Sequence, residues 1–168
     1  NNNATGTEQL VNPIASVSSG RYETNQLVVL SHVNPGASIR YTTDGSEPMP
    51  TSVLYTGAIS ITKTTTLKAK AFAPGFIPSK SEVKTYFIDE HTFTLPVVSI
   101  STNPSYLWDN LIGIYVEGTN GIKGSCSVTP VNWNQDWHRH TVFEYFDITG
   151  KKQFDQGVNI RIAGNCTG

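Results

Sequence analysis

Polar and apolar residues alternate through the first half of the chain, a pattern typical of half-buried β-strands. In the clearest run, residues 64–72, Leu67, Ala69 and Ala71 share one side and the lysines at 68 and 70 share the other. Shorter runs of the same kind lie at 26–31, 38–43, 53–55, 59–61 and 82–88. About seven short strands at regular spacing, without helical periodicity, predict an immunoglobulin-like β-sandwich over residues 11–90.

Turn chemistry separates these runs. The strand expected at 38–43 ends in Asp44-Gly45. An aspartate bonds its own backbone readily and glycine tolerates positive φ, so the chain reverses there at low cost. We expect Tyr41, Tyr55 and Tyr86 to fill the sandwich interior, and Tyr22 to pack at its end.

The second half has a different character, and we expect a boundary at the polar segment 89–92. An apolar run, 95–100, follows it. Asn103-Pro104 predicts the start of a short helical turn that reaches Trp108. Further strands are expected at 113–116, 140–146 and 158–163, with a hairpin turn at 147–151 and an irregular Gly-rich stretch at 118–131. These patterns predict an all-β protein, in which residues 91–168 form a second, smaller, mainly-β unit and residues 1–10 a disordered tail.

The composition excludes some classes of function. Charged residues make up 15% of the chain, the net charge is −1, and no run of one sign occurs. Nucleic-acid binding needs a clustered basic surface, so we exclude it. No apolar stretch approaches the ~20 residues that span a bilayer, so we also expect no membrane span. Abundant Asn, Thr, Ser and Gly are common in secreted β-proteins.

The chain has two cysteines, Cys126 and Cys166. A disulfide between them would close a loop of about 40 residues and contribute roughly 3–5 kcal/mol in the chain-entropy model. The alternative is a pair of unpaired thiols.

Four segments resemble a known family: Tyr41–Pro48 (YTTDGSEP), Tyr55-Thr56-Gly57, Thr66–Ala71 (TLKAKA) and Ser81–Phe87 (SEVKTYF). Together they resemble the C-terminal module of chitobiases and β-hexosaminidases, an immunoglobulin-like domain that recurs as an accessory unit in secreted bacterial proteins. The resemblance implies an extracellular support or display role rather than chemistry.

The second half carries another resemblance. The segments LPVVSI (95–100), GIYV (113–116), Asn132-Trp133, EYFD (144–147) and GVNIRIAG (157–164) fall in the order seen at the start of CotH-like proteins, the family named for spore-coat protein H. That family includes atypical secreted kinases whose nucleotide-binding residues lie further along. The resemblance therefore implies that residues 91–168 are the truncated start of a CotH-like region, and that this fragment is not an enzyme. For a longer parent protein, kinase activity stays open.

The residues themselves offer little chemistry. The glycines at 113, 118, 121 and 124 match neither the P-loop nor the kinase glycine loop. We find neither a pair of glycosidase carboxylates nor a nucleophile elbow, and we expect no cofactor. Asp136, His138 and His140 occupy alternate positions that would share one face of a strand, as zinc ligands do. A fourth ligand is missing, so solvated polar residues are the favoured interpretation and we predict no metal.

Carbohydrate binding is the alternative function. Trp133, Asn134, Asp136 and Trp137 form an aromatic and polar cluster, to which Tyr106, Trp108 and Tyr115 could add. Exposed aromatic rings of this kind stack on the apolar faces of sugars. The competing interpretation places the rings in the core, because tryptophan usually buries most of its surface. This applies above all to Trp133, whereas Trp137 is the better candidate for exposure. The sequence thus predicts a non-catalytic extracellular spacer module, or a carbohydrate-binding module whose partners are glycans or cell-surface components.

Overall fold

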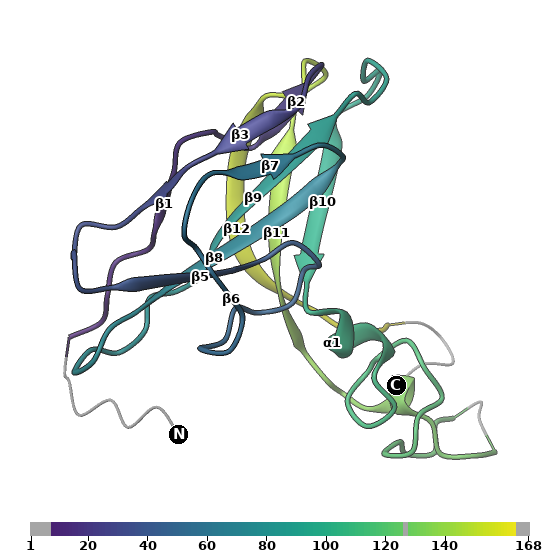
Figure 1. Cartoon of the computed structure of the whole chain (residues 1–168). Helices are drawn as coiled ribbons and strands as arrows, with labels where there is room; N and C mark the ends of the chain where they lie inside the picture. The colour runs from purple at the N-terminus through teal and green to yellow at the C-terminus, as the bar shows by residue number, and fades with distance from the viewer. Residues whose placement is uncertain (1–7, 126–127, 164–168) are drawn as a thin grey trace. The chain divides into compact units, whose positions relative to one another are not determined.

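The computed structural model describes residues 8–125 and 128–163 (Figure 1). Strands form 41% of the chain and helices 5%, which confirms the predicted all-β class. The chain divides into two compact units. The first contains the residues up to Val98 together with Tyr145–Phe154, and the second contains Ser99–Glu144 and the residues from Asp155 onward. The cysteine pair, Cys126 and Cys166, lies outside the described residues.

Among the described residues, the first unit is built on a five-stranded sheet in the order β2-β9-β8-β5-β6. Two small sheets, β1-β4 and β3-β7, accompany it. β2 pairs with β9 in parallel, and the other pairs are antiparallel. The strands are β1 (Ile14–Ala15), β2 (Gly20–Tyr22), β3 (Gln26–Val28), β4 (Leu30–Ser31), β5 (Ser38–Thr42), β6 (Val53–Leu54), β7 (Ile59–Ile61), β8 (Thr65–Phe72) and β9 (Glu82–Ile88).

The run 26–31 was expected to be one strand, and this prediction is wrong. It divides at Val29 into β3 and β4, which pair with different strands. Val29 bonds Ser16 instead: its N–H donates to Ser16 Oγ at 2.9 Å, and its carbonyl accepts from the Ser16 N–H at 2.9 Å. The chain thereby passes from one small sheet to the other without leaving these backbone groups unpaired.

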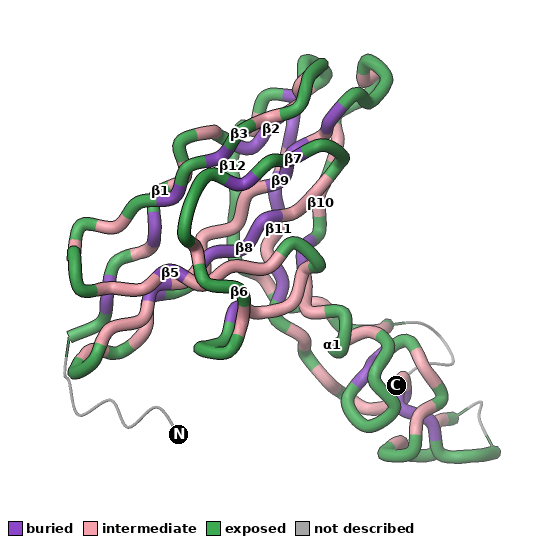
Figure 2. Tube along the Cα trace, viewed as in Figure 1, coloured by how far each residue is buried: buried purple, intermediate pink, exposed green. Residues whose placement is uncertain are grey.

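The core of the first unit is made by alternate residues of its strands. Leu67 and Ala69 on β8 and Ala71 further along are at most 1% exposed, as the alternation predicts. Tyr86 is fully buried, and its hydroxyl donates to the Val17 carbonyl at 3.0 Å. Figure 2 shows the buried positions along these strands. The other members of this core are Val28, Leu30, Ile39, Ile59, Ile61 and Ile88. Tyr86 fills the interior as expected, whereas Tyr22, Tyr41 and Tyr55 are partly buried and pack against the core.

The opposite side of β8 is also covered, which the alternation does not reveal. Lys68 is only 5% exposed, and its ammonium group donates to the Gly45 carbonyl at 2.7 Å. Burial lowers the pKa of Lys68, although the nearby carboxylates of Glu47 and Asp44 oppose that shift. The Asp-Gly turn therefore folds over the lysine face of the sheet.

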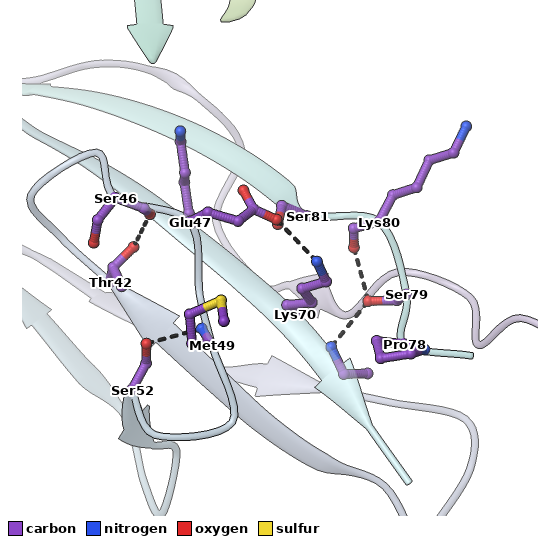
Figure 3. Close-up of polar contacts among 12 residues, drawn as sticks. Thr42, Ser46, Glu47, Met49, Ser52, Lys70, Pro78, Ser79, Lys80 and Ser81 are labelled. Carbon is purple, nitrogen blue, oxygen red and sulfur yellow. Dashed lines mark hydrogen bonds and ion pairs between the residues drawn. The ribbon is translucent and has the colours of Figure 1, made fainter. Parts of the chain in front are cut away.

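Glu47 fixes this turn to the sheet (Figure 3). Its Oε1 accepts from Lys70 Nζ at 3.0 Å and from Ser81 Oγ at 2.6 Å. Burial alone would raise the pKa of Glu47, but these hydrogen bonds and the two lysine charges outweigh it and hold the pKa below its ordinary value. We call Glu47, Lys68, Lys70 and Ser81 the turn lock.

The turn itself has the predicted chemistry. Gly45 has a φ of 83°, and Asp44 Oδ1 accepts from the Ser46 N–H at 3.0 Å. Hydrogen bonds from Ser46 lower the pKa of Asp44. Within the motif YTTDGSEP, the side chains of Thr42, Asp44 and Glu47 all have partners within the fold, so the motif is an internal structural device.

The later part of the chain contributes a three-stranded sheet, in the order β10 (Val97–Thr102), β11 (Arg139–Phe146) and β12 (Lys152–Ile160). It also contains the helix α1 (Pro104–Trp108) and the 3₁₀ turn η1 (Asn132–Asn134). Asn103 caps α1, since its Oδ1 accepts from the Ser105 N–H at 3.1 Å, which confirms the predicted helix start. The strand expected at 158–163 instead begins earlier, as part of β12.

The predicted strand at 113–116 does not form. The N–H groups of Ile114 and Tyr115 donate to the carbonyls of Tyr106 and Leu107, both at 2.9 Å. The last carbonyls of a helix lack partners within it, and here this segment satisfies them. The backbone groups that would have paired with a neighbouring strand are used to close the end of α1.

Candidate aromatic binding surface

Two large aromatic rings lie exposed side by side at the end of α1. Trp108 is 60% exposed and Tyr115 is 59% exposed. Their ring centroids are 5.6 Å apart, and their planes are tilted by 55°. The backbone bonds from residues 114 and 115 back to α1 bring Tyr115 beside Trp108. We call Trp108 and Tyr115 the aromatic surface; both belong to the second unit.

A buried asparagine holds the loop that carries Tyr115. Asn132 is fully buried, and its Nδ2 donates to the carbonyls of Asn110 and Gly113, both at 3.1 Å. Its Oδ1 accepts from the Asn120 N–H at 3.1 Å, and its own N–H donates to the Glu117 carbonyl at 2.7 Å. Four points of the segment 110–120 are therefore bound to a single residue of η1.

The glycines of the irregular stretch allow this close approach. A Cβ at Gly118 would lie 2.0 Å from Asn132 Nδ2, and Gly118 also has a φ of 63°. A Cβ at Gly121 would lie 2.0 Å from the backbone carbon of Val131, and one at Gly124 would lie 2.7 Å from Asn134 Cγ. The glycines are thus needed for packing against residues 131–134, which agrees with the interpretation of this stretch as a loop rather than a phosphate cradle.

Arg139 fastens the base of the loop. Its Nε and Nη2 donate to the Ile112 carbonyl at 3.1 and 2.6 Å. Its guanidinium lies over the ring of Trp137, 4.6 Å from the centroid, and over Tyr106 at 5.7 Å. Such cation–π contacts stabilise the arrangement and cover one face of each ring.

The cluster proposed from sequence is spread out rather than gathered. Trp133 and Trp137 are both half-buried, and Arg139 covers one face of Trp137. Asn134 is 2% exposed, and its Nδ2 donates to the Ile122 carbonyl at 3.0 Å. Asp136 is exposed and pairs with Arg161 at 3.1 Å. The structure thus assigns Asn134 to the interior, and the most exposed aromatic rings of this region are Trp108 and Tyr115.

The histidines do not gather ligands in the part of the chain that the structure describes. His138 Nε2 lies 3.6 Å from Asp136 Oδ1, an oxygen that Arg161 also contacts. The ring of His140 lies beside Gly157. Over residues 8–125 and 128–163, no group of three or more His, Cys, Asp or Glu side chains is placed to hold a metal ion.

A surface hollow and the helices add no further candidate site. A hollow in the first unit is lined only by consecutive residues, 90–97, so it brings together no side chains from separate elements. Within the described ranges, no helix is long and apolar enough to span a membrane.

Comparison with known proteins gives one match. The family model described as chitobiase/beta-hexosaminidase C-terminal domain matches residues 17–85. This segment is therefore similar to an accessory, immunoglobulin-like module, and the match includes the Asp-Gly turn and the turn lock. Neither the curated proteins nor the solved structures contain a match to the chain.

Proposed function

We propose that this chain is a non-catalytic extracellular structural module in which residues 11–90 serve as a spacer or support. The match of residues 17–85 to the accessory family carries this proposal. The chemistry of the motif supports it, because the charged groups of the turn lock are bound to one another and to the backbone instead of facing a substrate.

We also propose that residues 91–168, which follow the accessory domain, are the start of a CotH-like region. Its support is the order of the sequence segments. An extracellular or bacterial cell-surface location is likewise part of the proposal, supported by the Asn-, Thr-, Ser- and Gly-rich composition and by the accessory family.

An incubation assay tests the absence of catalysis. The purified chain is mixed separately with chitin, cellulose, xylan and peptidoglycan, and released soluble sugars are measured over time. The proposal expects no release above a heat-denatured control. Release that depends on the folded protein would contradict it.

A second candidate function is carbohydrate binding. The specific observation in its favour is the aromatic surface, because two adjacent rings about 60% exposed are unusual for residue types that normally bury most of their area. Sedimentation of the chain with the same four polysaccharides tests this function. Retention supports a binding module, and the absence of retention leaves the structural role alone.

A further inference from the structure

We propose that Trp108 and Tyr115 form a binding surface for a single, uncharged glycan chain. This inference rests on the carbohydrate-binding function above and gives it a location, a ligand class and a ligand form. It moves the site from the Trp133–Trp137 segment to the end of α1.

The backbone that carries Tyr115 is held in place before any ligand arrives. The peptide N–H of Tyr115 is bonded to Leu107, and Asn132 fixes the loop on both sides of the ring at Asn110, Gly113 and Asn120. Rigid aromatic side chains lose little conformational entropy on binding, which favours affinity.

The rings lie among both apolar and polar side chains, as a sugar-binding surface requires: Leu111 is 59% exposed and Ile112 is 39% exposed. Asp109, Asn110, Thr119 and Asn120 are exposed on the same loop, and Asn110 Nδ2 lies 3.2 Å from Thr119 Oγ1. A pyranose has an apolar C–H face bordered by hydroxyl groups. The negatively polarised face of an aromatic ring attracts the C–H face of the sugar, and amide, hydroxyl and carboxylate groups bind its hydroxyl groups.

Local charge indicates an uncharged ligand. The loop carries two exposed carboxylates: Glu117, and Asp109, whose Oδ1 accepts from the Leu111 N–H at 2.8 Å. The guanidinium of Arg139 is bound to the Ile112 carbonyl. An anionic polysaccharide would meet like charge near the rings, which is unfavourable. Neutral glycans of glucose, xylose or N-acetylglucosamine carry no such cost.

The angle between the rings indicates the form of the ligand. Two planes tilted by 55° cannot both lie flat on one crystalline polysaccharide surface. They can contact successive sugars of one chain, because a free chain twists. We therefore expect soluble oligosaccharides to bind and crystalline cellulose or chitin to be retained weakly.

Calorimetric titration of the full chain tests the proposal. The probes are cellohexaose, xylohexaose and chitohexaose, with hexagalacturonic acid as the anionic comparison. We expect at least one neutral probe to bind, and its affinity to fall about tenfold or more in Trp108→Ala and in Tyr115→Ala, as loss of an aromatic anchor does. Trp108→Phe should retain part of the affinity.

Phe154→Ala is the matched control, because Phe154 is also an exposed aromatic residue, at 52%, but belongs to the first unit. It should leave affinity unchanged. Since Trp108 and Tyr115 are mostly exposed, all variants should keep the thermal midpoint of the parent, which separates lost contacts from lost folding.

Each outcome tests a different part of the proposal. If the parent chain binds no neutral probe, both the carbohydrate function and this surface are refuted. If it binds and both alanine variants bind equally well, the function stands and the location is wrong. Preference for hexagalacturonic acid refutes the ligand class, and tighter retention on crystalline polysaccharide refutes the single-chain form. Self-association that Trp108→Ala abolishes would assign the surface to a second copy instead.

Discussion

Replacing Glu47 with glutamine removes the charge at the centre of the turn lock while keeping the size of the side chain. A hydrogen bond to a charged group contributes about 1.5–3 kcal/mol when well buried. The Glu47 side chain is 41% exposed, so its ion pair with Lys70 adds only about 0.2–1 kcal/mol. Glutamine can still accept from Ser81. Weakening of the Ser81 hydrogen bond from a charged to a neutral acceptor costs about 1 kcal/mol. Together with the ion pair, we expect a loss of about 1–2 kcal/mol in the free energy of unfolding of the first unit.

The effect should depend on pH with a definite sign. The folded-state pKa of Glu47 is lowered, so the carboxylate contributes stability that is fully present above its unfolded pKa, about 4.3. That contribution is lost as the pH falls through the lower folded-state value. The difference between parent and Glu47→Gln should therefore be largest at pH 7 and should shrink progressively below about pH 4.

Native-state hydrogen exchange of the β8 amides provides the assay, because the three tryptophans lie in the second unit and their fluorescence does not report on the first. Glu23→Gln is the matched control: its side chain is 83% exposed and its pair with Arg21 spans 3.7 Å, so it should change stability by less than about 0.5 kcal/mol. A loss below about 0.3 kcal/mol in Glu47→Gln at pH 7, or one that persists unchanged in acid, would refute the turn lock.

The other predictions concern the core and the loop, each measured by urea unfolding or hydrogen exchange. Leu67→Ala should destabilise the first unit by about 2–5 kcal/mol, because Leu67 is 1% exposed, whereas Leu27→Ala, at a 63% exposed site, should cost less than about 1 kcal/mol; equal losses would contradict the assigned core. Gly121→Ala should destabilise the second unit by about 1–3 kcal/mol, because its Cβ would overlap Val131, while Gly57→Ala, which meets nothing within 4 Å, should be near neutral; a neutral Gly121→Ala would contradict the loop packing. Asn132→Ala should weaken glycan affinity and increase amide exchange across residues 110–120 without touching the ligand; unchanged exchange would remove its positioning role.

Much of the first unit follows from the sequence, because a core on one side of each strand leaves an alternating pattern. Leu67, Ala69 and Ala71 were placed correctly on that basis. The same pattern put Lys68 and Lys70 on the other side but gave no sign that Lys68 is buried there. Alternation identifies which residues share a face, but it does not show whether another segment covers that face, and here the Asp-Gly turn does.

The second unit was harder to predict because local sequence competes with non-local partners. Residues 113–116 have the composition of a strand, yet the N–H groups of Ile114 and Tyr115 bond to carbonyls at the end of α1. The glycines at 118, 121 and 124 were assigned to a loop. Glycine is required there because residues 131–134, ten or more positions away, approach the backbone too closely for a Cβ. Their regular spacing of three was the available signal that one surface presses against this stretch.

The aromatic surface was only partly visible in the sequence. Trp108 and Tyr115 were named as secondary candidates, since Trp133 and Trp137 lie closer together and sit among more polar residues. A cluster in sequence is not a cluster in space: η1 turns Asn134 inward, and Arg139 covers Trp137. The return of the chain along α1 places Trp108 beside Tyr115, and no local pattern encodes that return.

The most direct test of the division between a supporting first unit and a binding second unit is one NMR measurement. The ¹⁵N-labelled full chain is titrated with the neutral hexasaccharides, and shifted amides are mapped onto the sequence. The account predicts shifts in residues 106–120 and none in residues 17–85, the segment similar to the accessory family. Ligand-dependent shifts within residues 17–85, with residues 106–120 unaffected, would contradict it.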